Sequence, residues 1–499
     1  MTLTESGAGT APPSSPARKQ ESKRTAGQAI QALLLRLHFY AGVFVAPFIL
    51  IAAVTGALYA ISPTLENITD RGLLHTDSTG PVQPLRDQVT AALAVEPALT
   101  LNAVDPAQNL GDTTRVIFTD PSLGESERRA VFVDPVTARP VGDSVVYGSS
   151  GALPMRTWID QLHRDLHLGD FGRYYSEIAA SWMWVVALAG LVLWIRRVRA
   201  RRERRSAGWL LRPDRSRPRG RTLNWHAAVG VWILPIILLL SVTGMTWSKY
   251  AGEHVDGLRS ALSWTTPSVT AKLPGNTDMA MPAMGDHAEH MGGGTQSGPA
   301  SNAANALLFD TVFGVARAND LTGPLEISVP SGDGMAFVAQ ELRRPGQYTR
   351  DAIAVNGTTG VITDKLPYSE WGLMAKLTNW GIQFHMGLMF GLLNQLLLLA
   401  VMIGLITVIV RGYLMWWRRR PTKASGLSAG KPPRRGALKQ TPLIIVAPLA
   451  VASVVVGWFA PMLGIPLLAF LIVDVLVGVL SRGRATPEPA APEKAEVTP

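Results

Sequence analysis

The sequence predicts a polytopic α-helical membrane protein built from a duplicated unit of span, outside domain and span. Three observations support this prediction: long apolar runs alternate with long polar stretches, basic residues gather in short loops, and histidines recur with glycines at matched spacings. The chain has 499 residues, 47% of them hydrophobic, and contains no cysteine. Without thiols it forms no disulfide, no iron–sulfur cluster and no covalently attached c-type haem.

Six apolar segments are long enough to cross a bilayer, which takes roughly 20 residues. They are 37–61, 178–195, 227–247, 388–417 and a C-terminal pair within 441–480. Only Pro461 separates the members of the C-terminal pair. This pair is therefore either a hairpin of two membrane helices or one re-entrant hairpin.

Lysine and arginine set the predicted orientation of these segments. The short loops between the second and third spans and after the fourth span are strongly basic, which places them in the cytoplasm. The N-terminal segment is read as a cytoplasmic tail and not as a signal peptide. The cytoplasmic segments are 1–36, 196–226, 418–440 and 481–499, and the outside segments are 62–177 and 248–387. The net charge of +10 is thus a topology signal, and nucleic-acid binding is not expected.

The chain aligns with itself in two ungapped frames. The first frame superposes His38 on His226, Gly42 on Gly230, Pro47 on Pro235, and Thr55-Gly56 on Thr243-Gly244. The second frame superposes His163 on His385, Gly169 on Gly391, Gly190 on Gly412, and Trp194 on Trp416. Both copies run in the same direction, which predicts parallel repeats related by an axis along the membrane normal. Each outside domain is predicted to be a small α+β module of a helix and an antiparallel hairpin.

Four histidines recur in these frames. A single interfacial histidine can cap a helix or meet lipid headgroups, but polar residues kept at membrane depth in both copies indicate function. By orientation, His38 and His226 lie near the cytoplasmic face, and His163 and His385 lie near the outer face. Two histidines that face each other at one depth suit six-coordinate haem iron, whereas structural zinc takes four ligands. His167 is an alternative outer ligand.

The recurrent glycines are consistent with haem. Gly42 and Gly230 follow their histidines by four residues, on the same helix face, where a missing side chain lets a porphyrin approach. Gly56 and Gly244 follow the same histidines by 18 residues and are expected to leave room for a second haem. The alternative is that these glycines serve only close helix packing. A helix running unbroken from His163 would exceed the bilayer, so a break is expected near Gly169.

The second outside segment carries an insertion, DMAMPAMGDHAEHMGGG, that is rich in methionine and histidine. Thioether and imidazole groups in a flexible loop suit copper, especially Cu(I). The alternative is a linker with fortuitous composition. The candidate copper ligands are Met279, Met281, Met284, His287, His290 and Met291.

Taken together, these motifs resemble the PepSY-associated transmembrane family over roughly residues 30–420. The span motifs are HFYAGVFVAPFILIAAVTGALY, LHRDLHLGDFGR, HAAVGVWILPIILLLSVTGMTW and GYLMWWRRR, and FVDPVTARPVG and AVNGTTGVITD mark the PepSY modules. The resemblance implies a bacterial inner-membrane protein with both termini in the cytoplasm. It also implies two b-type haems, held by His38, His163, His226 and His385, that pass electrons outward to ferric siderophores during iron uptake.

The expected activity is therefore that of a di-haem membrane ferric siderophore reductase. No glycine-rich strand–turn–helix signature for a dinucleotide appears, so the electron donor is expected to be a separate molecule. The competing class is a non-catalytic PepSY membrane protein that binds a partner, a protease or a metal. A haem-free preparation that keeps full function would favour this second class.

Overall fold

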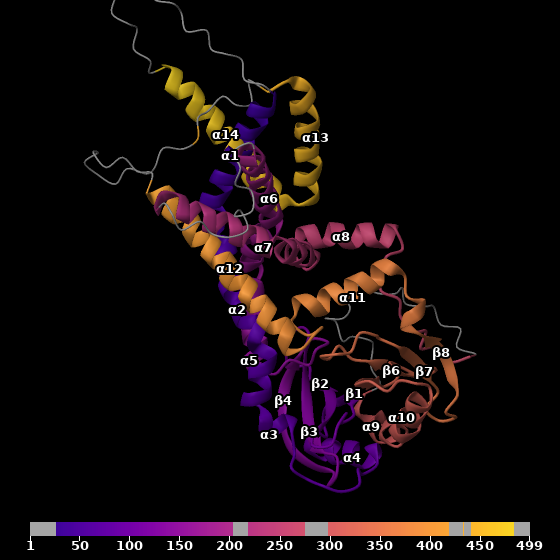
Figure 1. The fold of residues 1–499 in the computed structure, drawn as a ribbon. Helices are drawn as coiled ribbons and strands as arrows, with labels where there is room; N and C mark the ends of the chain where they lie inside the picture. The colour runs from indigo at the N-terminus through magenta and orange to yellow at the C-terminus, as the bar shows by residue number, and fades with distance from the viewer. Residues whose placement is uncertain (1–25, 203–217, 275–297, 419–432, 434–440, 484–499) are drawn as a thin grey trace, which may run out of the picture.

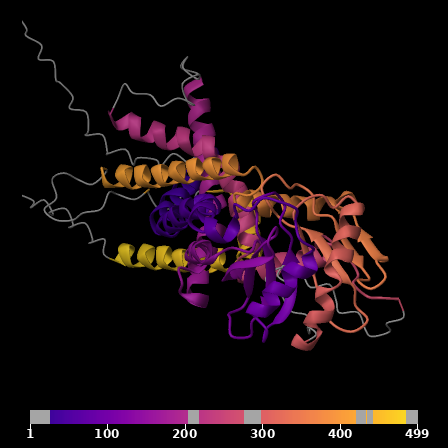
Figure 2. The ribbon, with the colours of Figure 1, turned by 90° about the horizontal axis from the view of Figure 1, so that it is seen from below.

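The computed structural model describes residues 26–202, 218–274, 298–418, 433 and 441–483. These residues form a helical bundle, a sheet domain at one end of the bundle, and a C-terminal helix pair beside it (Figure 1). Seen from the sheet end, the sheet domain is displaced to one side of the bundle (Figure 2). The protein is thus mostly helical, with one β domain.

Four helices among the described residues are long and apolar enough to cross a membrane. They are α2 (Ala46–Thr69), α6 (Gly169–Arg202), α7 (Pro218–Thr246) and α12 (Leu392–Trp417). Each buries one stripe in the bundle and leaves large apolar side chains exposed on the other side, as helices surrounded by lipid do. Small residues such as Ala53 and Ala179 lie in the buried stripe, where they allow close helix packing.

The first membrane helix differs from the single span predicted for 37–61. α1 (Ala26–Phe44) ends just before α2, and Pro47 lies in the first turn of α2. Proline has no N–H to give the preceding turn, so it begins a helix more readily than it continues one. The apolar span therefore starts at Ala46. The corresponding Pro235 lies inside an unbroken α7, so the two halves differ here.

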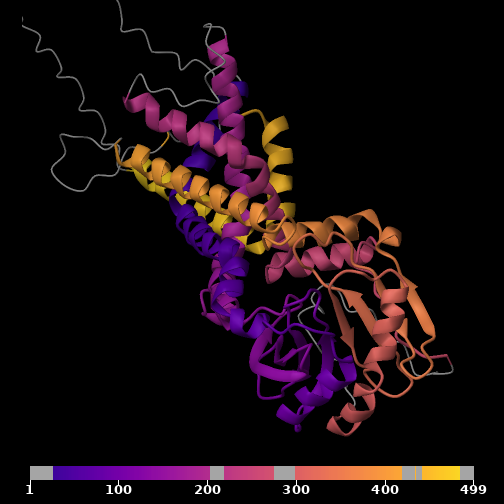
Figure 3. The ribbon, with the colours of Figure 1, turned by 60° about the horizontal axis from the view of Figure 1, so that its bottom comes forward.

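The two polar segments between the membrane helices contribute to one antiparallel sheet of eight strands, in the order β4-β3-β2-β1-β5-β6-β7-β8. The strands are β1 (Thr100–Asp105), β2 (Thr114–Thr119), β3 (Glu127–Asp134), β4 (Arg139–Tyr147), β5 (Leu325–Ser328), β6 (Phe337–Glu341), β7 (Ala352–Val355) and β8 (Ile362–Leu366). Figure 3 shows the first four strands in purple beside the last four in orange. The halves meet where Val104 of β1 pairs with Ile327 of β5. This pairing satisfies two strand edges that separate modules would leave open.

One face of the sheet is covered by α4 (Leu85–Val95), α9 (Asn302–Ala306) and α10 (Phe309–Ala318). Phe118 and Phe309 are fully buried in the resulting core. Near the bundle lie α5 (Pro154–Asp165), α8 (Tyr250–Ala261) and α11 (Leu373–His385), with α8 and α11 extending to one side of it, above the sheet domain (Figure 1). The short helices are α3 (Arg71–Leu74), η3 (Pro299–Ser301) and η4 (Tyr368–Glu370).

The C-terminal pair consists of α13 (Leu443–Phe459) and α14 (Pro461–Gly483). Both are apolar, but their apolar stretches are shorter than the four main spans. Three polar contacts hold the pair to the rest of the protein. Arg36 Nη2 donates to Asp474 Oδ1 at 2.8 Å, Trp182 Nε1 to the Met462 carbonyl at 3.2 Å, and His254 Nδ1 to the Phe459 carbonyl at 2.8 Å.

Candidate functional site: two histidine pairs

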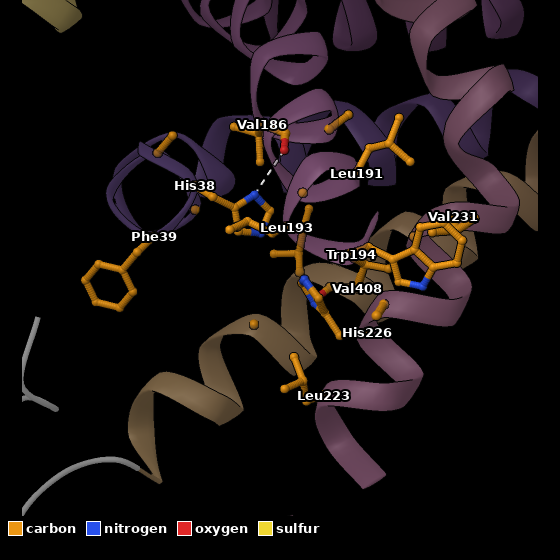
Figure 4. A pocket seen from close by; sticks show the side chains of 18 of the residues that line it. His38, Phe39, Val186, Leu191, Leu193, Trp194, Leu223, His226, Val231 and Val408 are labelled. Carbon is orange, nitrogen blue, oxygen red and sulfur yellow. Dashed lines mark hydrogen bonds between the residues drawn. The ribbon is translucent and has the colours of Figure 1, made fainter. Parts of the chain in front are cut away.

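The first pair lies at the end of the bundle distant from the sheet domain. His38 on α1 and His226 on α7 have ring centroids 6.1 Å apart, with the rings at 81° (Figure 4). We call them the inner pair. An imidazole nitrogen bonds a transition metal at about 2.0 Å and the ring centre lies about 1.1 Å behind it, so two axial imidazoles have centres about 6.2 Å apart. The inner pair therefore has the spacing of two axial ligands of one metal ion.

Backbone carbonyl groups orient both rings of the inner pair. His38 Nδ1 lies 3.0 Å from the carbonyl of Val186, and His226 Nδ1 lies 2.9 Å from that of Val408. A carbonyl only accepts hydrogen bonds, so Nδ1 carries the proton and Nε2 keeps its lone pair. This is the arrangement usual for metal-ligating histidines.

A glycine lies against each of these imidazoles. Gly190 and Gly412 lie one helical turn after Val186 and Val408, on α6 and α12. A Cβ at Gly190 would lie 3.0 Å from Cε1 of His38, and one at Gly412 would lie 3.7 Å from Cε1 of His226. The missing side chain at Gly190 lets the His38 ring reach the carbonyl one turn before, whereas a Cβ at Gly412 would make an ordinary van der Waals contact with His226. The sequence frames matched these two glycines but gave them no role.

A cavity of about 930 Å³ adjoins the inner pair. This volume is near the upper end of the range for small-molecule pockets, about 300–1,000 Å³. Gly42 and Gly230 line it; a Cβ would meet nothing within 4 Å at Gly42 and only Val408, at 4.0 Å, at Gly230. The indole nitrogen of Trp194, which also lines the cavity, is buried without a hydrogen-bond partner. The apolar walls, the facing imidazoles and this free donor fit a haem group.

The second pair lies where the bundle meets the sheet domain. His163 on α5 and His385 on α11 have ring centroids 6.5 Å apart, again close to the separation of two axial ligands. We call them the outer pair. Their Nδ1 atoms lie 2.9 Å from Oγ1 of Thr55 and 2.6 Å from Oγ1 of Thr243.

The threonines fix the protonation of the outer imidazoles. Each hydroxyl donates its own proton to a carbonyl one turn earlier on its helix, so it accepts from Nδ1–H of the histidine. Nε2 is again left free. Burial lowers the pKa of His163 to about 4 and that of His385 to about 3, which keeps both rings in the neutral form that binds metals.

Gly56 and Gly244 lie against the outer imidazoles. A Cβ at Gly56 would lie 3.2 Å from Cε1 of His163, and one at Gly244 would lie 3.8 Å from Cε1 of His385. Gly56 therefore makes room for the edge of the His163 ring, whereas a Cβ at Gly244 would meet His385 at an ordinary van der Waals distance. Each threonine provides an acceptor for one histidine, and the glycine that follows it lies at the edge of the same ring.

The break after α5 separates His163 from His167. Leu166 and His167 both have left-handed backbone conformations, with φ of 57° and 56°, and α6 begins at Gly169. The turn is tight, because a Cβ at Gly172 would collide with the carbonyl oxygen of Asp165. His167 stacks near Trp158, with ring centroids 5.0 Å apart, while His163 faces the bundle.

Aromatic side chains flank the outer pair. The Tyr59 ring stacks on His163 at 6.2 Å, and the Trp247 ring meets His385 edge-on at 5.3 Å. Beside them lies a small cavity of about 60 Å³, which Arg156 also lines. Sequence reasoning missed these neighbours and both threonine hydroxyls. The Thr-Gly repeat was the available signal for the hydroxyls.

The other predicted metal site lies outside the described residues. The candidate copper ligands Met279, Met281, Met284, His287, His290 and Met291 all fall in the segment 275–297. Within the described part of the chain, no group of three or more His, Asp or Glu side chains could hold a metal ion. The copper site therefore stays a prediction.

Comparison with known proteins gives one match. The model of the family described as "PepSY-associated TM region" matches residues 35–419, which include all four histidines and both threonines. The match ends before the C-terminal helix pair. No curated protein matches the chain.

Proposed function

The chain belongs to the PepSY-associated TM region family, and from this premise we propose that it is a di-haem membrane protein carrying electrons across the bilayer to a ferric complex. The observation that supports the proposal best is the pair of bis-imidazole separations, 6.1 Å and 6.5 Å, each with Nδ1 hydrogen-bonded and Nε2 free. Two independent sites share one ligand arrangement, which packing of isolated histidines does not explain.

The four histidines would hold two non-covalent b-type haems, one at each end of the bundle. Bound haem supplies a one-electron couple that no side chain here provides. The protein would contribute imidazole ligands of fixed tautomer, apolar burial, and a set of packed helices that keeps the two sites at separate depths. On the unbroken helix α7, Thr243 follows His226 by 17 residues, which is about 25 Å of helix.

We place the inner pair at the cytoplasmic face of a bacterial inner membrane and the outer pair at the opposite face, with both termini in the cytoplasm. The basic loops support this orientation. A separate donor would reduce the inner site. The acceptor would be Fe(III) in an outside complex such as a ferric siderophore, which takes one electron and leaves as weakly bound Fe(II).

Haem content of the purified protein tests the proposal. We expect two haems per chain by pyridine haemochrome assay, with low-spin reduced spectra and full extraction into acidic acetone. His38→Ala or His226→Ala should remove one haem, and His163→Ala or His385→Ala the other. His167→Ala is the matched control and should leave both.

The reaction itself is tested by mixing. The protein is reduced with dithionite and freed of excess reductant. A ferric siderophore should then reoxidise the haems, with one Fe(II) formed for each haem oxidised. A haem-free wild-type protein would contradict the proposal and favour the alternative, a membrane protein whose sheet domain binds a partner or a protease. Two bound haems with no reoxidation would limit the proposal to haem binding.

A further inference from the structure

The small cavity beside the outer pair contains a buried arginine, two nitrogens of which make no hydrogen bond. Arg156 lines this cavity, and its side chain is only 3% exposed. Its Nη1 lies 3.6 Å from Oε1 of Glu66, but its Nε and Nη2 have no hydrogen-bond partner. Glu66, Asp160 and the Tyr59 hydroxyl stabilise its charge, but the donors on Nε and Nη2 have lost water without a well-formed hydrogen bond, which is costly.

The size and charge of the cavity indicate what would satisfy this arginine. A volume of about 60 Å³ corresponds to about two waters at ~30 Å³ each, which is the size of a carboxylate group and far below a porphyrin. Its charged lining residues are Arg156, Arg343 and Asp160, so cations outnumber anions. Guanidinium groups pair best with carboxylates and phosphates. Because a phosphate is the bulkier of the two, a carboxylate is the better fit to this cavity.

The position of Arg156 relative to the outer pair suggests the source of the carboxylate. Arg156 and His163 are both on α5, seven residues apart. Seven residues are two turns of helix, so the side chains lie on one face about 10.5 Å apart along the axis. Haem carries its two propionates on one edge of the macrocycle, displaced from the iron by the ring radius and a short chain. This displacement is of the same order as two helical turns.

We propose that Arg156 binds a carboxylate in this cavity, and that the carboxylate is a propionate of the haem held by the outer pair. The inference rests on the proposed function. The position corresponding to Arg156 in the second half is Thr378, so the outer site has this arginine on one side only. Arg156 would then fix the rotation of the haem about the axis through the two histidines.

Haem dimethyl ester, in which both propionates are esterified, separates this idea from a structural role. The experiment uses the full chain carrying His38→Ala, so that only the outer pair can bind haem. The Soret absorbance measures the uptake of haem or of its ester. We expect the ester to bind roughly ten- to a hundredfold more weakly than haem, the loss expected for charge-assisted hydrogen bonds. Arg156→Gln should bind both forms equally weakly, and Arg156→Lys should restore part of the difference.

The matched control is Arg164→Gln, on the same helix, whose side chain is 42% exposed and donates to Tyr147. It should still discriminate haem from the ester. If the carboxylate instead belongs to an outside iron complex, haem and ester bind alike, and calorimetric titration with ferric citrate weakens in Arg156→Gln. Equal haem, ester and citrate binding in all variants would overturn the inference. No haem uptake by the wild type would instead overturn the proposed function.

Discussion

At the scale of single residues, the two histidine pairs differ in the group that accepts the hydrogen bond from Nδ1–H. The inner imidazoles donate to backbone carbonyls that are already part of a helix, and a glycine lies one turn later. The outer imidazoles donate to Thr55 and Thr243 at helix positions followed directly by a glycine. In each case a glycine lies at the edge of the ring, and a fixed oxygen sets the tautomer; the space is tight at Gly190 and Gly56. The histidine then presents Nε2 in one orientation.

The threonine acceptor can be tested alone. Thr55→Val keeps the shape of the side chain but removes the acceptor for Nδ1 of His163. Loss of such an outer-shell hydrogen bond typically costs about 10–100-fold in metal affinity, because the ring loses its orientation and basicity. We expect this loss at the outer haem only, measured by haem titration. Thr55→Ser should behave like the wild type.

Thr378→Val is the control for this substitution. Thr378 is on the same helix as His385, but its hydroxyl donates to the Met374 carbonyl of that helix. It should leave both haem affinities unchanged. An unchanged outer affinity in Thr55→Val would show that the hydroxyl does not support the ligand.

A buried carboxylate in the sheet predicts a pH effect on stability. Burial, and then the nearby Glu326, raise the pKa of Asp105 to about 6, although Arg344 and Arg115 oppose the shift. The folded pKa exceeds the unfolded value, so this group contributes stability below about pH 4 that is lost as the pH rises through about 6. At about 1.4 kcal/mol per pKa unit, the loss is at most about 3 kcal/mol.

We therefore expect Asp105→Asn to reduce the fall in unfolding temperature between pH 4.5 and pH 7.5. Thermal unfolding of the purified protein measures it. Asp143→Asn, on β4 and with a side chain 45% exposed, should keep the wild-type slope. Parallel pH profiles of Asp105→Asn and the wild type would contradict the role assigned to Asp105.

At the scale of elements, self-alignment of the sequence located the four histidines and the glycines beside them, because a duplicated helix keeps its contacts at fixed offsets. It could not predict the contact between Gly190 and His38, since these residues lie on two different helices. The tight turn after Asp165 was expected from Gly169, and the structure has it there. Arg156 gave no signal, because an arginine two turns before a histidine is unremarkable until burial is known.

The ion pair of Arg36 and Asp474 is one of the polar contacts that hold the C-terminal helix pair. Arg36 and Asp474 have side chains 10% and 24% exposed and lie between apolar helices. Removing one partner leaves the other charge poorly solvated, which costs up to about 3–5 kcal/mol for a buried pair. We expect Asp474→Asn to lower the unfolding temperature of the purified protein.

A double variant distinguishes charge from packing at this contact. Arg36→Met with Asp474→Leu removes both charges and should recover most of the lost stability, because apolar side chains of similar volume replace a buried pair at little cost. Equal destabilisation of the single and double variants would mean that the ion pair does not hold the hairpin.

At the scale of the whole molecule, the membrane class and the family were predictable, because hydropathy and span motifs are local signals; the model of the family confirms the resemblance. The union of the two outside segments was not predictable. β1 and β5 are short strands more than 200 residues apart in the sequence, and the residue pattern of neither strand identifies the other as its partner. The sequence suggested two modules, and the strand order makes them halves of one sheet.

The β1–β5 junction predicts that the sheet domain opens as one unit. Ile327 is fully buried in β5, between β1 and β6. Ile327→Pro removes an N–H and fits poorly in a central strand, a change that costs about 3 kcal/mol or more in regular structure. Hydrogen exchange read by mass spectrometry should then show lost protection on both sides of the junction, in β1 and β2 as well as in β6 and β7.

The edge strand β8 provides the control, because Thr363→Pro lies where one side of the strand is unpaired. Its effect should be confined to β7 and β8. If Ile327→Pro exposes only β5 to β8 and leaves β1 to β4 protected, the halves are separate modules that merely touch. If protection falls in all the strands together, the sheet couples the two halves of the chain, and a change at one half reaches the loops beside both outer histidines.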